Sequence, residues 1–487
     1  MTIAMYVVIA AAALPALIYL ALAFREAARG LTLGRFFPLS RFVPAGAYGR
    51  STAAAGVSLA TVILALVNLS PVLGLGLLIT VASYVGGFMV LYWVAPHILR
   101  ANPDNHTLQS YLGSVYGPGV KYVSIAFTFV GYMSIFSMEI LVGVSVLEPI
   151  FPGQGLPIAT LFLAFIVLYS TIGGFRAIVA TEQWQIRFVV AAVAALVLTG
   201  VLLWFGRDWT PSAQGIVAAL SQTWAPGWAF ALGIVAMNLP AAVSDAATWQ
   251  RLCATASEQD ARRGLRQAMV MFAAIWGTLI VASCFIGLVA AQGYGFDASK
   301  QPLMDFIMSF LAGGGVLSSI LLFVFVLGLL AALVTTADSL MLVAAQMLSL
   351  DVLKLDHQTG SERGKVFQAR LVLALVAAAS FGLFALFRIL KLDVVSLVFA
   401  IYGAQLALFP TVAFALMTKN PLARRAASSA AVISILGGFA AGWAAALYGR
   451  FTGAMTWTYD APAVALAVAL LLFVVARPLL KSRVSPP

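Results

Sequence analysis

Residues 316–345 read VLSSILLFVFVLGLLAALVTTADSLMLVAA. About 20 apolar residues form an α-helix long enough to cross a bilayer, and this run is longer. Near its end, the sequence Thr335-Thr336-Ala337-Asp338-Ser339 places a carboxylate and three hydroxyls among the apolar residues. Because a charge at the bilayer centre costs at least ~2.5 kcal/mol, we interpret this segment as a membrane-spanning helix that carries part of a functional site.

The composition of the whole chain also indicates a membrane protein. Of its 487 residues, 62% are hydrophobic and only 9% are charged, whereas soluble proteins carry about 45–50% and about 25%. This excludes a soluble enzyme, a disordered chain and a nucleic-acid binder. The two cysteines and three histidines form no metal-binding or disulfide pattern. No ATP-binding motif is present, so any transport has to be driven by a gradient.

Thirteen apolar runs in the chain are long enough to span a bilayer. None shows the alternating pattern of a transmembrane β-strand. We therefore predict an all-α integral membrane protein of about thirteen transmembrane helices. They are expected near 3–24, 52–70, 74–96, 122–147, 155–174, 184–205, 227–249, 266–292, 315–348, 368–387, 394–417, 428–448 and 460–480.

The basic residues are distributed unequally between alternate connections. Of the 28 Lys and Arg residues, 23 fall on one side of the predicted membrane and five on the other. Basic connections face the cytoplasm. We therefore expect a multi-pass protein of the plasma membrane (a cell inner membrane protein), with its amino terminus outside and its carboxyl terminus in the cytoplasm.

Few polar groups lie at membrane depth, and these are the candidate functional residues. Three acids, Glu139, Asp245 and Asp338, lie within predicted spans, and we expect no deeply buried Lys or Arg. The sequence Asn238-Leu239-Pro240 interrupts the seventh span, because proline removes a backbone donor. Broken helices of this kind bind substrate and ions in transporters. The bland alternatives are a packing kink at the proline and hydroxyls that bond back to their own helix.

Three segments together resemble the sodium:solute symporter family. Residues 173–185, GGFRAIVATEQWQ, are similar to the family's GG-x-x-A-V-x-x-T-D-x-x-Q segment. Residues 245–254, DAATWQRLCA, resemble the segment after its seventh helix. The run 335–339, followed by Asp351 and Lys354, resembles its ninth helix, S-T-A-D-S … D-x-x-K. The segments occur in family order, and the resemblance covers essentially the whole chain.

The resemblance implies the leucine-transporter fold within one transmembrane domain over 1–487. Its core would be two five-helix repeats of inverted topology, 52–205 and 227–417. The helix 3–24 and the two helices within 428–480 would be additions. The first helix of each repeat would be broken near the membrane midplane.

The resemblance also implies a sodium site between the second and ninth spans, with Na⁺ as the coupling ion. Backbone carbonyls and side-chain hydroxyls would be the ligands. They would come from Ala54, Val57, Ala332, Thr335 and Thr336. The register of the second span is open, and a shift of a few residues would replace Ala54 and Val57 with Ser58 and Thr61.

A second cation or proton site is implied by some relatives. Its residues would be Glu182, Asp338 and Ser339, although Glu182 stands where the family has Asp. Glu182 could instead cap the start of a helix, where an acid is favourable.

The substrate would lie at the break, close to Asn238, Ser58 and Thr61, with Tyr132 and Glu139 as further candidates. Glu139 could stay protonated, bind an amine or pair with a hydroxyl. Without a deep Lys or Arg, a carboxylate substrate would have to be held by helix N-termini and hydroxyls.

These observations predict a sodium-driven symporter of a small organic solute, with an amino acid or a monocarboxylate favoured. We expect it to work as a monomer in the lipid bilayer, without a nucleic-acid partner, and not to be an enzyme. One alternative is a proton-coupled carrier on the same fold, with an acid such as Asp338 taking the proton. The others are a transporter-like membrane sensor module and a channel.

Overall fold

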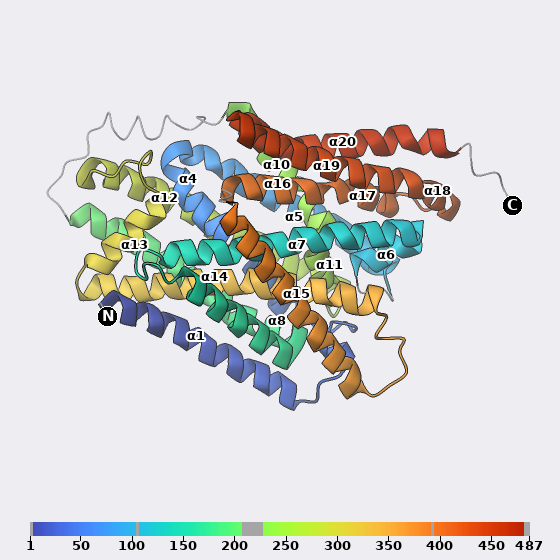
Figure 1. The fold of residues 1–487 in the computed structure, drawn as a ribbon, viewed down its shortest axis with the longest axis horizontal. Helices are drawn as coiled ribbons and strands as arrows, with labels where there is room; N and C mark the ends of the chain where they lie inside the picture. Colours follow the sequence, from blue (N-terminus) through green and yellow to red (C-terminus); the bar gives the residue numbers. More distant parts are fainter. Residues whose placement is uncertain (1–2, 104–106, 207–226, 391–393, 482–487) are drawn as a thin grey trace.

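The computed structural model describes residues 3–103, 107–206, 227–390 and 394–481, and every regular element within these ranges is helical. Most of the long helices run side by side along the long axis of the molecule (Figure 1). The helices of the first half are α1 (Ile3–Ala28), α2 (Leu33–Phe36), α3 (Ala45–Ala55), α4 (Ala65–Leu73), α5 (Leu78–Ala101), α6 (Leu108–Tyr116), α7 (Pro118–Leu147) and α8 (Gly155–Phe205).

The second half of the chain contains eleven α-helices in its described part. They are α10 (Gly227–Ser244), α11 (Ala246–Cys253), α12 (Glu258–Tyr294), α13 (Leu303–Gly313), α14 (Val316–Gln346), α15 (Glu362–Ile389), α16 (Val394–Gln405), α17 (Phe409–Met417), α18 (Pro421–Ala426), α19 (Ser428–Thr452) and α20 (Met455–Lys481). Short turns of π- or 3₁₀-helix extend or join some of them: η1 (Leu59–Leu64), η2 (Gly74–Leu77), η3 (Met347–Val352) and η4 (Leu406–Leu408).

Eleven helical segments of the described chain are long and apolar enough to cross a membrane. Two of them, of 43 and 51 residues, run over 59–101 and 155–205, and each covers two of the predicted spans. The longer one bends at Gly174, whose φ of +60° suits glycine and whose Cβ, if present, would lie 2.7 Å from the Phe36 carbonyl oxygen. The prediction of a multi-pass, all-α membrane protein is confirmed, and the number of thirteen crossings stays a prediction.

The start of α1 and the end of α20 lie at opposite ends of the molecule (Figure 1). The helix ends next to several basic connections gather toward the end of the molecule where α20 ends. They are the end of α1, the start of α15, and α6 and α18 (Figure 1). An odd number of crossings gives this arrangement. The side of the membrane that each end faces stays a prediction.

Helix α14 lies at the centre of the molecule and packs against α1, α7 and α8. Its residues from Phe325 to Gln346 are all buried. Just beyond its end, Asp351 accepts a hydrogen bond from Thr107 (2.8 Å) and pairs with the ammonium of Lys121 (3.0 Å). Because α14 is surrounded by protein, its polar side chains have to be satisfied by other helices or by a ligand.

Candidate functional site

The second predicted span is broken, as expected. Helix α3 ends at Ala55, and helical structure resumes at Leu59, with Ser58 in an extended conformation between them. The Ser58 hydroxyl accepts a hydrogen bond from the amide of Thr61 (2.8 Å), so it caps the second half of the helix. A Cβ at Gly56 would lie 2.3 Å from the ring of Phe272, so the chain passes this point too closely for a larger residue.

The seventh predicted span is also broken, but the expected position of the break was wrong. Helix α10 continues through Pro240 to Ser244, and the break is at Asp245. The Asp245 carboxylate accepts hydrogen bonds from the amide and the hydroxyl of Thr248 (both 2.7 Å) and from Tyr132 (2.5 Å). Aspartate competes in this way for backbone amides and favours a helix start, whereas proline removes a single donor.

Two cavities meet at the first break. The larger, of about 300 Å³, is lined by Ser58, Thr61 and Asn238 among other residues. The smaller, of about 130 Å³, is lined by several polar side chains: Thr52, Tyr132, Asp245, Thr248, Arg251, Thr336 and Ser339. Both cavities share lining residues, including Ala55, Gly56 and Tyr402.

The structure therefore distributes the predicted substrate residues over three places. Ser58, Thr61 and Asn238 lie together in the larger cavity. Tyr132 lines the smaller one, where its hydroxyl also accepts a hydrogen bond from the amide of Ala247 (2.8 Å). Glu139 lines neither cavity and is fully buried behind Ser58.

The predicted sodium ligands lie at the junction of α14 with the first break. The hydroxyls of Thr335 and Thr336 are buried and have no hydrogen-bond partner within the described chain. Thr336 shares the smaller cavity with Ala55, which follows the predicted ligand Ala54. Neither hydroxyl bonds back to its own helix, although Ser339 does so, to the carbonyl of Thr335 (2.7 Å). Two neighbouring orphaned hydroxyl oxygens, one of them lining a cavity at the first break, fit a hard cation, which prefers oxygen ligands.

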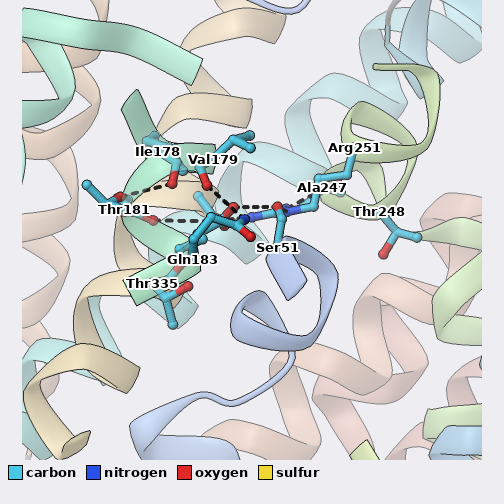
Figure 2. Close-up of polar contacts among 12 residues, drawn as sticks. Ser51, Ile178, Val179, Thr181, Gln183, Ala247, Thr248, Arg251 and Thr335 are labelled. Atoms are coloured by element: carbon cyan, nitrogen blue, oxygen red, sulfur yellow. Dashed lines mark hydrogen bonds and ion pairs between the residues drawn. The ribbon is translucent and has the colours of Figure 1, made fainter. Parts of the chain in front are cut away.

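The expectation that no Arg or Lys is deeply buried was wrong. The side chain of Arg251, from α11, is only 4% exposed. Its guanidinium lies 2.6 Å from the Glu182 carboxylate and donates to Ser339 (2.5 Å) and Ser51 (3.2 Å). Figure 2 shows this side chain reaching from α11 toward Ser51 on α3. Arg251 follows the second break by six residues, which is why its position in the sequence resembles that of a connection.

A guanidinium therefore lies against two residues of the predicted second cation site, Glu182 and Ser339, and cation binding there stays a prediction. Glu182, which lies inside α8 and is not a helix cap, also accepts a hydrogen bond from Ser51, and its carboxylate lies 3.1 Å from the Ser339 hydroxyl oxygen. Asp338 accepts a hydrogen bond from Tyr169, and its carboxylate also lies 3.1 Å from the Ser339 hydroxyl oxygen. The guanidinium supplies the positive charge between these two acids that a second cation would otherwise have to supply.

Glu139 pairs with a hydroxyl, which was one of its three expected roles. Its carboxylate accepts a hydrogen bond from the Ser58 hydroxyl and others from the amides of Leu59 (3.1 Å) and Ala60 (3.3 Å). These amides begin the second half of the broken helix. A side chain from α7 thus holds the break of the second span in place.

Solved structures resemble this chain, whereas no protein-family model and no curated protein matches it. A Na⁺-coupled sialic acid symporter, substrate-bound and outward-open, superposes with a TM-score of 0.78 at 15% identity over 98% of both chains. MhsT in complex with L-phenylalanine gives 0.56 at 12% identity, over 90% of this chain and 99% of that one. A manganese transporter mutant from Eremococcus coleocola gives 0.52 at 12% identity, over 92% and 100%.

These comparisons establish the fold. The chain has the leucine-transporter fold that the resemblance implied, and the predicted fold class is confirmed. The symporter and the manganese transporter are transport proteins and not enzymes, in agreement with the prediction. At these identities the likeness extends to the arrangement of helices and not to individual side chains.

Several residues of the site were not predicted from the sequence. Arg251 was assigned to a connection, and its position in the Trp-Gln-Arg segment was the available signal. Tyr84, Trp276 and Tyr402 line the larger cavity, but single aromatic residues within apolar runs are indistinguishable from ordinary core residues. Their roles depend on helix packing that no local pattern encodes.

Proposed function

We propose that the protein is a secondary active transporter that couples sodium entry to the symport of a small organic solute by alternating access. The observation that carries this proposal is the pair of orphaned hydroxyls on α14, Thr335 and Thr336. Thr336 lines the smaller cavity together with Ala55 and Gly56 of the first break, and the solute-sized cavity shares these two residues. The fold, shared with a Na⁺-coupled symporter, supports it.

Sodium would bind between α14 and the break that follows α3. Its ligands would be the carbonyls of Ala54, Val57 and Ala332 and the hydroxyls of Thr335 and Thr336. The solute would bind in the adjoining cavity of about 300 Å³, which Ser58, Thr61 and Asn238 line. Because that cavity borders the same break, sodium there orders the segment that the solute contacts.

One sodium ion supplies enough free energy for concentrative uptake. A single inward charge gains about 2.3 kcal/mol per 100 mV, and a tenfold sodium gradient adds about 1.4 kcal/mol. Together these sustain accumulation of a neutral solute by more than about a hundredfold. With Arg251 between Glu182 and Ser339, we propose one sodium ion per cycle. We also propose a monomer in the plasma membrane, with its amino terminus outside.

The test is uptake into proteoliposomes loaded with potassium, where valinomycin sets the membrane potential. Uptake of a solute should require external sodium and should rise with an inside-negative potential. The variant Thr336→Val removes a ligand oxygen and should raise the sodium concentration that gives half-maximal uptake. Thr336→Ser keeps the oxygen and serves as the matched control. Uptake that ignores sodium and potential overturns the proposal. Uptake driven by a pH gradient in sodium-free buffer would instead establish proton coupling.

A further inference from the structure

The carboxylate of Glu139 occupies the start of the helix that resumes after the first break. Glu139 is fully buried, and its oxygens accept hydrogen bonds from the Ser58 hydroxyl and from the amides of Leu59 (3.1 Å) and Ala60 (3.3 Å). The amides at a helix start have no partner within the helix and carry partial positive charge, so they bind anions. In discontinuous helices of transporters they hold the carboxylate of the substrate.

We propose that this protein transports an uncharged solute. The carboxylate of Glu139 already occupies the helix start at the first break, where the carboxylate of a substrate would otherwise bind. This inference rests on the proposed function and names its substrate class. It argues against the amino acid or monocarboxylate favoured on the sequence alone, since the amides that would hold such a carboxylate are already bonded.

The lining of the larger cavity independently favours an uncharged solute. Its lining residues include no Asp, Glu, Lys, Arg or His among those that the structure describes. One wall holds the rings of Tyr84 and Trp276, stacked with centroids 4.3 Å apart. The polar groups of the lining are neutral, as at Ser58, Thr61 and Asn238. A charged group enclosed by this lining would lose its hydration without gaining a charged partner from it.

The charge balance at the first break also favours an uncharged substrate. Ser58, which bonds to Glu139, directly follows Val57, one of the proposed sodium ligands. If Glu139 is ionised, its charge would offset that of a sodium ion bound at this break. A neutral solute preserves this balance. A carboxylate would add an uncompensated negative charge, and an ammonium group would meet the field of the sodium.

The first experiment compares binding of matched pairs of probes to the purified protein in sodium buffer, by the rise in melting temperature that a ligand produces. The pairs are phenylacetamide with phenylacetate and nicotinamide with nicotinate, which differ in one charged group. We expect the amides to bind about tenfold or more tightly than the carboxylates. Tighter binding of the carboxylates overturns the inference.

The second experiment removes the tethered carboxylate. Glu139→Ala leaves the two amides without a partner, so acetate should restore part of the lost melting temperature, whereas acetamide and chloride should not. The wild type should not respond to acetate. Glu139→Gln keeps the shape of the side chain and tests the charge alone, and we expect it to weaken sodium binding about tenfold. Acetate that stabilises the wild type and Glu139→Ala equally, or an unchanged sodium affinity in Glu139→Gln, overturns the role of Glu139.

The two proposals fail in different ways. Sodium-dependent uptake of a carboxylate with weak uptake of its amide would retain symport and refute the uncharged substrate. Acetate rescue of Glu139→Ala together with sodium-independent uptake of the amides would retain the substrate class and refute sodium coupling.

Discussion

Replacing Arg251 by methionine should expose a cation site that the wild type keeps closed. The guanidinium is 4% exposed and makes its 2.6 Å ion pair with Glu182, which is fully buried. Methionine fills the space of the aliphatic stem and removes the charge. The side-chain oxygens of Ser51, Glu182, Asp338 and Ser339 then surround a space that carries negative charge and no cation.

The expected magnitude follows from the burial of the pair. Removing one member of a buried ion pair destabilises a protein by about 3–5 kcal/mol, so Arg251→Met should lose about that much in sodium-free buffer. Sodium that enters the vacated position stabilises the folded state by about 2.7 kcal/mol at a hundred times its dissociation constant. About half to nine tenths of the loss should therefore be recovered in sodium.

The assay is a series of melting curves in sodium, with choline substituted to keep the ionic strength constant. The wild type should titrate with one sodium, and Arg251→Met with two. The matched control is Arg100→Met, because Arg100 is 72% exposed and is also paired, with Glu258 at 2.7 Å. Solvent screens such an exposed pair, so it contributes little to stability, and this variant should behave as the wild type. The reasoning is refuted if Arg251→Met melts like the wild type in choline, or if its sodium titration is unchanged.

Four further substitutions test the packing of α10, the second break and the segment that follows α14. Gly87→Ala would place a Cβ 2.4 Å from the carbonyl oxygen of Asn238 and should destabilise the protein by about 1–3 kcal/mol. The control Gly382→Ala would place a Cβ with no other atom within 4 Å, so it should be neutral or stabilise the protein by about 0.5–1 kcal/mol. Melting curves measure both effects. Tyr132→Phe leaves a buried amide and a carboxylate without their hydroxyl partner and should cost about 1–3 kcal/mol, and an unchanged melting temperature would contradict the described geometry. Asp351→Asn loses a buried ion pair with a lysine and should lower both the melting temperature and the rate of sodium-dependent uptake, whereas full uptake would show that this anchor is dispensable.

The helices could be predicted because a membrane span is a local property of composition. All predicted spans coincide with helical segments of the structure. The orphaned hydroxyls of Thr335 and Thr336 stand out for the same reason, since polar groups are rare in an apolar run. Where they lie relative to the first break could be expected only through the resemblance to a family.

The breaks and the ion pair were harder to predict because they depend on distant partners. A proline in the sequence favours a break at Pro240, but the break at Asp245 is held by Tyr132, which is 113 residues away in the chain. The burial of Arg251 depends on Glu182, 69 residues away. The positive-inside rule places an arginine by its neighbours in sequence, so it cannot distinguish a buried ion pair near a break from a connection.

The guanidinium of Arg251 bonds at once to residues of α3, α8 and α14, through Ser51, Glu182 and Ser339. All of these bonds are made by one guanidinium group. When one of the three helices moves away, the bonds of Arg251 to the other two helices therefore weaken as well. A junction of this kind has two well-populated arrangements, intact and separated, and few between them. Opening of this side of the molecule is therefore expected to be all-or-none, which limits leakage of ions during the change of access.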